Sequence, residues 1–468
     1  MVKSKNRKEM LVESIILAEE QPYDIPNNWI WTKLKFLFEI NMGQSPKGEF
    51  TTEESCYIPL VGGPADMGKD FPMVSRYTKK ATKITTKNEL IISIRATIGK
   101  TNISDGEYCL GRGVAGIKSL NINTKLLRYY IDTIHPYLNT ISTGTTFKQI
   151  SKKNIEDIPF PLPPINEQRR IANKVERLLS KIDEAKQLIE EAKESFELRR
   201  AAILDKAFRG ELTKKWRVNH NIKNNDITPL NASLSFNIPK NWVVTNFQSI
   251  AADEKYSLAI GPFGSNLKVS DYTTEGIPLI FVRNIRSLNY KLEQKFVSVD
   301  KAIELKPHVV NSGDVLITKM GDPPGDSDIL PDSFGKAIIT ADCIKFRANN
   351  KLVNNRYVMY AIKSPFIQNQ IRKQSKGVAQ QKITLKIFKE LKIPVPVYDE
   401  QVKIVEILDK YMKDNECILS DIKITQNTLA LLKQSILSKA FRGELGTNDP
   451  NEEDAIDLLK QVLQEQVK

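Results

Sequence analysis

The sequence Lys-Ala-Phe-Arg-Gly-Glu-Leu at residues 206–212 is repeated, letter for letter, at residues 439–445. The two copies lie 233 residues apart (439 − 206 = 233), and the same offset relates Asn-Glu-Gln at 166–168 to Asp-Glu-Gln at 399–401. The segments that run from one motif to the next align without a gap. Local structure does not explain so long an identity at this range, so the chain is a tandem duplication.

Apolar residues recur in both aligned segments at alternating steps of four and three. This is the spacing of a coiled-coil seam, which is narrower than the apolar face of an ordinary globular helix. The predicted seam consists of Val175, Leu178, Ile182, Ile189 and Phe196 in the first copy and of Leu408, Tyr411, Asn415, Ile418, Ile422, Leu429 and Leu432 in the second. Two seams in one chain most simply bury each other, so we expect two long antiparallel helices of roughly 65 Å each at 1.5 Å per residue. The alternative is a pair of unrelated surface helices.

Each predicted helix carries signals for its two ends. Asn166 and Asp399 are suitable N-caps. Gly210 and Gly443 stand where a left-handed residue ends a helix. Asn415 takes a seam position, where it either fixes the register of the two helices or is simply solvated.

Two globular units precede the two helices. Ile-Pro-x-Asn-Trp at residues 25–29 recurs at 238–242, an offset of 213 (238 − 25 = 213), so the second unit is about twenty residues longer. Short apolar, β-branched stretches between turn residues predict strands in both units, and a helix is expected near residues 126–138. The fold class is therefore α+β, with two mixed units and two long helices. The predicted order is an N-terminal helix (1–20), a globular unit (21–157), a helix with its proline-rich lead (158–213), a polar linker (214–236), a second globular unit (237–391), a second helix (392–446) and an acidic, then helical, tail (447–468).

The composition favours a polyanionic partner. The formal net charge is +13, from 69 basic and 56 acidic residues. The four cysteines are scattered without a C-x-x-C pair, which argues against a zinc site or a disulfide framework. The sequence shows neither a signal peptide nor an apolar run of transmembrane length, so we expect a soluble, cytoplasmic protein that does not bind membranes.

A search for catalytic motifs finds none that convinces. The three histidines, at positions 135, 220 and 308, stand apart from one another and from the cysteines, so neither a metal site nor a histidine base is expected. Gly111–Gly116 fits G-x-G-x-x-G, but no suitable helix or acidic residue follows it. Asp322–Gly325 resembles the Asp-Pro-Pro-aromatic loop of adenine N6-methyltransferases without its aromatic residue. We therefore predict a non-catalytic chain.

Binding remains the more plausible task of the globular units. Their loops mix basic, amide and glycine residues, and in the major groove arginine pairs with guanine while asparagine or glutamine pairs with adenine. The candidates are Gln44, Ser45, Lys47, Arg95, Thr97, Lys100, Arg112, Thr145, Lys148 and Gln149 in the first unit and Ser265, Asn266, Arg283, Asn284, Arg286, Lys319, Lys376, Gln380, Gln381 and Lys382 in the second. The alternative is that many of these side chains are merely solvated.

The whole chain resembles the specificity (S) subunit of a type I restriction–modification system. The resemblance rests on the Ile-Pro-x-Asn-Trp start of each unit, the proline-rich strands before Asn-Glu-Gln and Asp-Glu-Gln, the two Ala-Phe-Arg-Gly-Glu-Leu endings, and the tail at residues 448–452. It implies that the globular units are target recognition domains and that the helices are antiparallel spacers. It also implies a bipartite, asymmetric target on double-stranded DNA.

The same resemblance implies partner proteins that carry the chemistry. Two modification subunits, which bind S-adenosylmethionine and methylate adenine at N6, dock on the helical region. Motor-nuclease restriction subunits that use ATP and magnesium join for cleavage, and this chain holds no cofactor or metal. The candidate docking residues at the helix ends are Phe208, Arg209, Gly210, Phe441, Arg442 and Gly443. Two rival functions remain at this point: a self-contained methyltransferase or nuclease, and a coiled-coil scaffold that does not read DNA.

Overall fold

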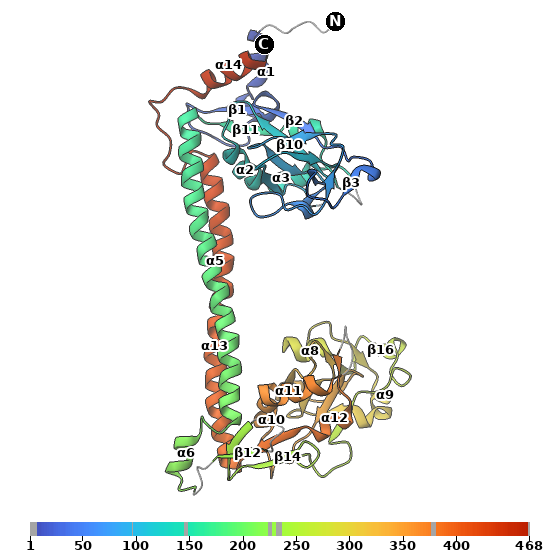
Figure 1. The fold of residues 1–468 in the computed structure, drawn as a ribbon. Helices are drawn as coiled ribbons and strands as arrows, with labels where there is room; N and C mark the ends of the chain where they lie inside the picture. The colour runs from blue at the N-terminus through green and yellow to red at the C-terminus, as the bar shows by residue number, and fades with distance from the viewer. Residues whose placement is uncertain are drawn as a thin grey trace. The chain divides into compact units, whose positions relative to one another are not determined.

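The computed structural model describes residues 7–95, 97–144, 148–222, 227–230, 236–375 and 381–466. The chain forms two compact units, one from residues 1–189 and 423–468 and the other from residues 190–422 (Figure 1). Each unit contains one mixed α/β domain and parts of both long helices. The α+β class predicted from the sequence is confirmed.

The domain of the first unit is built from two sheets. The antiparallel four-stranded sheet has the order β2 (Phe38–Met42), β10 (Val114–Ser119), β7 (Leu90–Ser93), β8 (Thr101–Ile103). The five-stranded sheet has the order β3 (Thr51–Thr52), β5 (Tyr77–Thr78), β4 (Ile58–Val61), β9 (Tyr108–Leu110), β6 (Ile84–Thr85), and β4 runs parallel to β9. Two helices, α2 (Thr124–Thr133) and α3 (His135–Thr140), pack their apolar sides on the four-stranded sheet in one core.

The domain of the second unit repeats this plan. Its four-stranded sheet has the order β15 (Leu258–Ile260), β24 (Cys343–Phe346), β20 (Val315–Thr318), β22 (Ser327–Ile329). Its five-stranded sheet has the order β16 (Tyr272–Thr273), β18 (Phe296–Val297), β17 (Ile277–Ile280), β23 (Ala337–Ile339), β19 (Val309–Val310), with β17 parallel to β23. When the strands of each sheet are numbered in chain order, the corresponding sheets of the two domains have the same strand order. The duplication therefore extends to the globular parts, although their sequences agree only at the ends.

Several further elements complete the second domain. The helices α8 (Val282–Ser287) and α9 (Val299–Glu304) lie in its longer connections. α10 (Asn355–Lys363) and α11 (Pro365–Gln374) contribute buried side chains to the main core, as do residues of α12 (Leu385–Glu390). The base of each domain is a two-stranded antiparallel ribbon, β1 (Ile30–Lys33) with β11 (Pro159–Leu162) and β14 (Val243–Asn246) with β26 (Lys392–Val395). The second strand of each ribbon is the proline-rich lead, and it delivers the chain into a long helix.

The long helices are α5 (Ile165–Phe208) and α13 (Tyr398–Phe441), each of 44 residues. In the first unit the start of α5 shares a core with the end of α13, through Ile171, Val175, Ile182, Ile436 and Leu437. In the second unit the end of α5 shares a core with the start of α13, through Leu204, Phe208, Ile404 and Leu408. The helices therefore run antiparallel in both units, as predicted.

The predicted seam is buried unevenly. Fully buried are Val175, Ile182 and Leu408, and partly buried are Leu178, Ile189, Phe196, Tyr411, Asn415, Ile422 and Leu429. Ile418 and Leu432 are 39% and 46% exposed, so the helix pair covers them only in part. An α-helix drifts by about 20° per heptad relative to a strict seven-residue stripe, which turns some seam positions outward. The Nδ2 atom of Asn415 is buried without a hydrogen-bond partner among the described residues, while the residue as a whole is partly exposed.

The helix ends partly follow the predicted signals. Gly210 and Gly443 have φ angles of +72° and +73°, which confirms both as left-handed stops. The prediction that Asn166 and Asp399 are N-caps is wrong, because α5 and α13 begin one residue earlier. The first regular i→i−4 bonds run to carbonyls of the preceding lead, from Gln168 N to Pro164 O at 3.0 Å and from Gln401 N to Val397 O at 3.1 Å, which places the helix starts there.

The first and last helices of the described residues meet in the first unit. The predicted N-terminal helix is shorter than expected, since α1 spans Arg7–Ser14 and Ile15 then pairs with Thr32 as an extended residue. The C-terminal helix α14 (Ala455–Gln466) contacts α1, and its Leu459 and Leu463 enter the core of the first domain (Figure 1). The acidic tail is thus an integral part of this unit.

The predicted polar linker contains regular structure. α6 (Lys214–Asn219) buries Arg217, and β12 (Ile227–Leu230) pairs with β13 (Phe236–Pro239). An asparagine-rich composition indicates a loop, but it cannot reveal that one arginine finds a buried partner far along the chain. No helix in the described ranges is long and apolar enough to cross a membrane.

Candidate nucleic-acid interface

The candidate residues of the first domain gather at one end of its four-stranded sheet. β2 and β7 end there while β10 and β8 begin there, because neighbouring strands run in opposite directions. The loops at this end are residues 43–47, 94, 95, 97–100 and 111–113, together with residues 143, 144, 148 and 149, and we call this set the first loop edge. Loops are the usual carriers of binding residues because a rigid sheet positions them.

Backbone contacts hold these loops beside one another. The amide of Gln44 donates to Leu110 O at 2.8 Å, the amide of Arg112 donates to Ser45 Oγ at 3.1 Å, and Arg95 forms an isolated bridge with Gln149. The exposed candidates at this edge are Gln44, Ser45, Lys47, Arg95, Thr97, Lys100, Arg112, Lys148 and Gln149. Thr145 lies outside the described residues. The structure therefore brings together side chains that are up to about a hundred residues apart in the sequence.

Two of these lysines have partners within the domain. The Nζ of Lys100 donates to Pro64 O at 3.1 Å and also to Met67 O, so its ammonium holds the loop after β4. Lys47 Nζ lies 3.7 Å from Glu49 Oε1, and both side chains are mostly exposed. An exposed pair of this kind contributes little stability. Lys47 therefore stays available to a phosphate, whereas Lys100 is already engaged.

Arg76 is a residue of this edge that the sequence did not point to. Its Nη2 lies 3.4 Å from Asp66 Oδ2, and the side chains of Arg76 and Asp66 are 52% and 11% exposed. Asp66 Oδ2 also accepts the amide of Gly62 at 2.7 Å. The sequence signal that indicates Arg76 is the turn at Gly62-Gly63-Pro64. Because glycine has no Cβ, the arginine side chain can lie directly against the backbone there.

The second domain has an equivalent loop edge. β15 and β20 end where β24 and β22 begin, and the loops at this end are residues 261–267, 319–326 and 340–342. The short helix α8 after β17 brings its arginines to the same place. A cavity of about 450 Å³ opens there, lined by Phe281, Val282, Arg283, Arg286, Met320, Gly321, Asp322, Thr340 and Asp342. We call this set, with residues 375, 381 and 382, the second loop edge.

Acidic and carbonyl partners orient the basic side chains of this edge. Arg286 Nε lies 2.9 Å from Asp326 Oδ2. Arg283 Nη2 donates to Glu293 O at 2.8 Å, and its guanidinium lies 4.1 Å from the centroid of the Phe281 ring. Lys319 Nζ donates to Ala341 O at 3.2 Å.

The remaining candidates of the second domain divide into two groups. Ser265, Asn266 and Lys382 are exposed, and Gln381 is partly exposed beside Ser375. Asn284 is 1% exposed; its amide nitrogen donates to the carbonyls of Asn289 and Leu292, and its oxygen accepts the amide of Phe281. This side chain folds its own loop, so we do not place it at a base edge. Lys376 and Gln380 lie outside the described residues.

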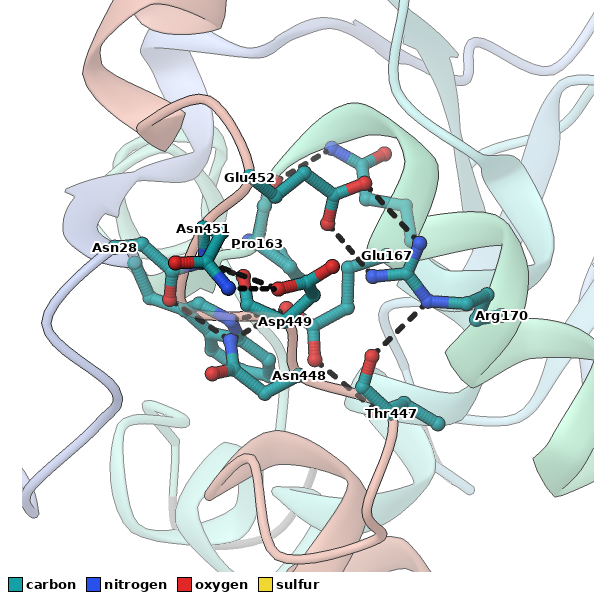
Figure 2. A network of polar contacts seen from close by, with 11 residues as sticks. Asn28, Pro163, Glu167, Arg170, Thr447, Asn448, Asp449, Asn451 and Glu452 are labelled. Atoms are coloured by element: carbon teal, nitrogen blue, oxygen red, sulfur yellow. Dashed lines mark hydrogen bonds and ion pairs between the residues drawn. The ribbon is translucent and has the colours of Figure 1, made fainter.

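The repeated motifs meet at a separate place, the junction between domain and helices. In the first unit Glu167, which is fully buried, accepts Trp29 Nε1 at 2.7 Å and Asn448 Nδ2 at 2.9 Å on one oxygen and Thr447 Oγ1 at 3.1 Å on the other. Asn448 also donates to Asn28 Oδ1 at 2.8 Å (Figure 2). One carboxylate thus joins the start of the domain, the start of α5 and the segment after α13.

The second unit repeats this junction with one change. Glu400, also fully buried, accepts Trp242 Nε1 at 3.1 Å on one oxygen and Thr213 Oγ1 at 2.7 Å on the other. Its third partner is the guanidinium of Arg217, on α6, where the first unit uses an asparagine amide. The side-chain exposures of Arg217 and Glu400 are 4% and 0%.

The glutamine that follows each glutamate makes a second matching pair of contacts. Gln168 Oε1 accepts the amide of Asn123 at 3.2 Å and its Nε2 donates to Pro163 O at 3.1 Å. Gln401 does the same with Asn354 at 2.8 Å and Pro396 O at 2.9 Å. The repeated motifs therefore build two equivalent joints.

Arg170 strengthens the joint of the first unit from the outside. Its two Nη atoms lie 3.1 Å and 2.6 Å from the two carboxylate oxygens of Glu452, and its Nε donates to Thr447 O at 3.0 Å (Figure 2). This bonding holds the pKa of the Glu452 carboxyl below its usual value. The tail is thereby tied to the first turns of α5.

Comparison with known proteins identifies the family. The model of the type I restriction modification DNA specificity domain matches residues 26–194 and 285–425. The chain belongs to this family. Its two mixed domains are DNA specificity domains of this family, as the sequence resemblance implied.

Individual relatives agree with this assignment. The chain is 27% identical to the EcoBI specificity subunit of Escherichia coli over 68% of its length, and 22% identical to the EcoKI specificity subunit of Escherichia coli K12 over 90% of both chains. The match covers 65% of the EcoBI subunit and 37% of a Methanocaldococcus jannaschii relative named for the MjaX enzyme, so the chain spans less than two thirds of these curated relatives. A chain from a structure on complex assembly and conformational transition of the type I R-M system shares the fold, with a TM-score of 0.68, 20% identity and coverage of 91% of this chain and 100% of that one.

The candidate docking residues of this specificity subunit are mostly inside the junctions. Phe208 and Phe441 are 0% exposed. A Cβ added to Gly210 would lie 2.5 Å from Pro239 Cγ, and one added to Gly443 would lie 2.3 Å from Pro26 Cγ. The two glycines thus lie against the prolines of the Ile-Pro-x-Asn-Trp motifs, while Phe208 packs on Tyr357 and Phe441 on Tyr130, so these four residues offer little surface to a partner.

The two arginines of the repeated helix endings differ in their partners. Arg209 Nε lies 2.6 Å from Asp205 Oδ2, and the Arg442 guanidinium lies 4.4 Å from the centroid of the Tyr23 ring. Arg442 is exposed and Arg209 is partly buried. In the part of the chain that the structure describes, no group of three or more His, Cys, Asp or Glu residues could hold a metal ion.

Proposed function

We propose that the chain reads a bipartite, asymmetric site on double-stranded DNA, one part with each loop edge. The observation that carries the proposal is that the two domains share one strand order but differ in the side chains of their loop edges. The same framework presents loops at the same places, whereas base readout depends on the side chains that the loops carry. The two parts of the target should therefore differ in sequence.

Exposed and partly exposed donors and acceptors of the loop edges supply the contacts. The proposed set is Gln44, Ser45, Lys47, Arg76, Arg95, Thr97, Arg112, Lys148 and Gln149 in the first domain and Ser265, Asn266, Arg283, Arg286, Lys319, Gln381 and Lys382 in the second. The net charge of +13 favours association with phosphates whatever the sequence. Binding should therefore weaken steeply as salt is raised.

The two long helices act as the spacer between the readers. Each has 44 residues, about 66 Å at 1.5 Å per residue. Readers that use one face of DNA are spaced by about one helical turn, roughly 34 Å, or a multiple of it. The helix length then sets the unspecified gap in the target, and each domain sets its own few base pairs.

The chain directs catalysis that partner subunits perform. Two modification subunits bind on the helical region, where Arg442 and Arg209 contribute to docking, and methylate adenine at N6 with S-adenosylmethionine. Restriction subunits that use ATP and magnesium join this complex for cleavage. Family membership supports this assembly. A scaffold that does not read DNA would not account for two matching frameworks with unlike loop edges.

An exchange of one domain tests independent reading. The chain is expressed with its modification subunit, and the methylated positions of the host DNA are sequenced. Replacing residues 25–157 with those of another specificity subunit should change one half of the target and leave the other half and the gap unchanged. A change in both halves would refute independent reading. Insertion of one heptad in α5 and one in α13 is the companion test, because an unaltered gap would contradict the spacer role.

A further inference from the structure

Arg286 is held by one edge of its guanidinium at the second loop edge. Its Nε pairs with Asp326 Oδ2 at 2.9 Å, and the side chains of Arg286 and Asp326 are 50% and 43% exposed. Asp326 is itself anchored, because its amide donates to Thr318 Oγ1 at 2.9 Å at the end of β20. An arginine fixed through Nε presents its remaining N–H groups in a defined plane.

Gly321 creates the space in which this guanidinium lies. A Cβ at this position would stand 2.4 Å from Arg286 Nη2 and 2.8 Å from Pro323 O. Any larger residue would push the guanidinium away or move the loop. Asp326 holds the guanidinium of Arg286 and Gly321 leaves room for it. Together they fix the orientation of the guanidinium.

The neighbouring strand adds another donor. β21 (Met320–Gly321) pairs with β25 (Gln381–Lys382), which sets Gln381 directly opposite Gly321. Gln381 Oε1 accepts Ser375 Oγ at 3.0 Å, so its amide offers Nε2 to a ligand. Arg286 and Gln381 both donate, and the base edge that presents two acceptors in the major groove is guanine, through O6 and N7.

The charges around the cavity favour a base over a phosphate. Asp322 and Asp342 line the cavity with Arg283 and Arg286, and Asp326 pairs with Arg286, so three carboxylates face two guanidinium groups. Carboxylates repel a phosphate, whereas they tolerate the neutral edge of a base pair. From these contacts we propose that Arg286 reads a guanine in the half-site of the second domain through a bidentate contact, with Asp326 as its positioning residue. This inference rests on the proposed function of the chain as a DNA reader.

The test uses the complex of the full chain with its modification subunit and a library of DNA duplexes randomised at the target. The variant Arg286→Lys keeps the charge but loses the planar fork. We expect it to keep the gap and the other half-site while its preference for one guanine falls by about 5- to 150-fold, the range expected for loss of a bidentate pair. Asp326→Asn should weaken the preference at the same position by a smaller factor, because it loosens the fork without removing it.

The matched control is Arg347→Lys. Arg347 pairs with Asp314 through Nε at 2.7 Å, just beyond the end of β24 that lies away from the loop edge. This variant should lower thermal stability without changing any base preference, which separates a structural loss from a loss of reading.

Three outcomes would overturn the proposal. The first is a second half-site without guanine, and the second is an Arg286→Lys complex that keeps its full preference at each position. The third is a uniform loss of affinity for all sequences with a shallower salt dependence, which would assign Arg286 to a phosphate. A wild-type complex that binds all duplexes alike would instead overturn the proposed function, and the reading role with it.

Discussion

Replacing Arg217 with methionine should destabilise the second unit by about 3 to 5 kcal/mol, because the change leaves a buried carboxylate without its cationic partner. Glu400 is 0% exposed and loses its cationic partner, although Thr213 and Trp242 still donate to it. The Gly210 carbonyl also loses its donor, since Arg217 Nη2 lies 2.6 Å from it. For a unit of this size one kcal/mol lowers the midpoint by roughly 2 to 4 °C, so the shift should be about 6 to 20 °C.

Hydrogen exchange followed peptide by peptide measures this loss in each unit separately. The double variant Arg217→Met with Glu400→Gln should recover much of the stability, since a neutral side chain replaces the stranded charge. The matched control is Arg170→Met in the first unit, where the arginine side chain is 41% exposed, and it should cost about 1 kcal/mol or less. A loss below 1 kcal/mol for Arg217→Met, or a double variant no better than the single one, would refute the reasoning.

Other predictions follow from single features of the two units. Burial lowers the pKa of Lys345 to about 8, so between pH 8 and its unfolded value near 10.5 the unfolded chain binds the extra proton and the folded state gains stability as pH rises. The total gain is up to about 3 kcal/mol, and urea titrations of Lys345→Met across this window should lack it. Gly443→Ala should destabilise the first unit by more than about 1 kcal/mol, because its φ is +73° and Pro26 fills the space of the Cβ. Calorimetry that shows no change would contradict that packing. Lys47→Ala should weaken binding to every duplex alike and reduce the salt slope by about one unit if Lys47 contacts a phosphate, and a salt titration that keeps its slope would remove Lys47 from the interface.

The sequence predicted the long helices well because their signal is periodic and local. The alternating steps of four and three between apolar residues, and the glycine after the end of each helix, indicate each helix within a few residues of where it occurs. The N-caps were misplaced by two residues, because each helix begins within the end of the preceding lead, where Pro164 and Val397 already accept the first i→i−4 bonds. The sequence did not reveal that the two domains share a strand order, because many different apolar sequences can form the same buried strand.

The junctions could not be predicted because their partners are remote. Trp29 and Glu167 are 138 residues apart, and Thr447 and Glu167 are 280 residues apart. The repeated letters marked these positions as important without saying what they touch. At the loop edges the reason is different. Asn284 has the side chain of a base reader but bonds to its own loop, whereas the sequence signal for Arg76 is the remote glycine turn at Gly62 rather than its own neighbours.

The two joints explain how one chain can hold domains that diverge. Each joint uses the tryptophan at the start of a domain, the glutamate at the start of one long helix and the threonine after the end of the other. The loop edges use a different set of residues, between the strands of the sheets. A substitution at a loop edge therefore leaves the joint intact, while a substitution in the joint costs stability and leaves the reading side chains unchanged. The third partner of the glutamate, an amide in the first unit and Arg217 in the second, shows that even the joint tolerates change where a second donor can satisfy the buried carboxylate.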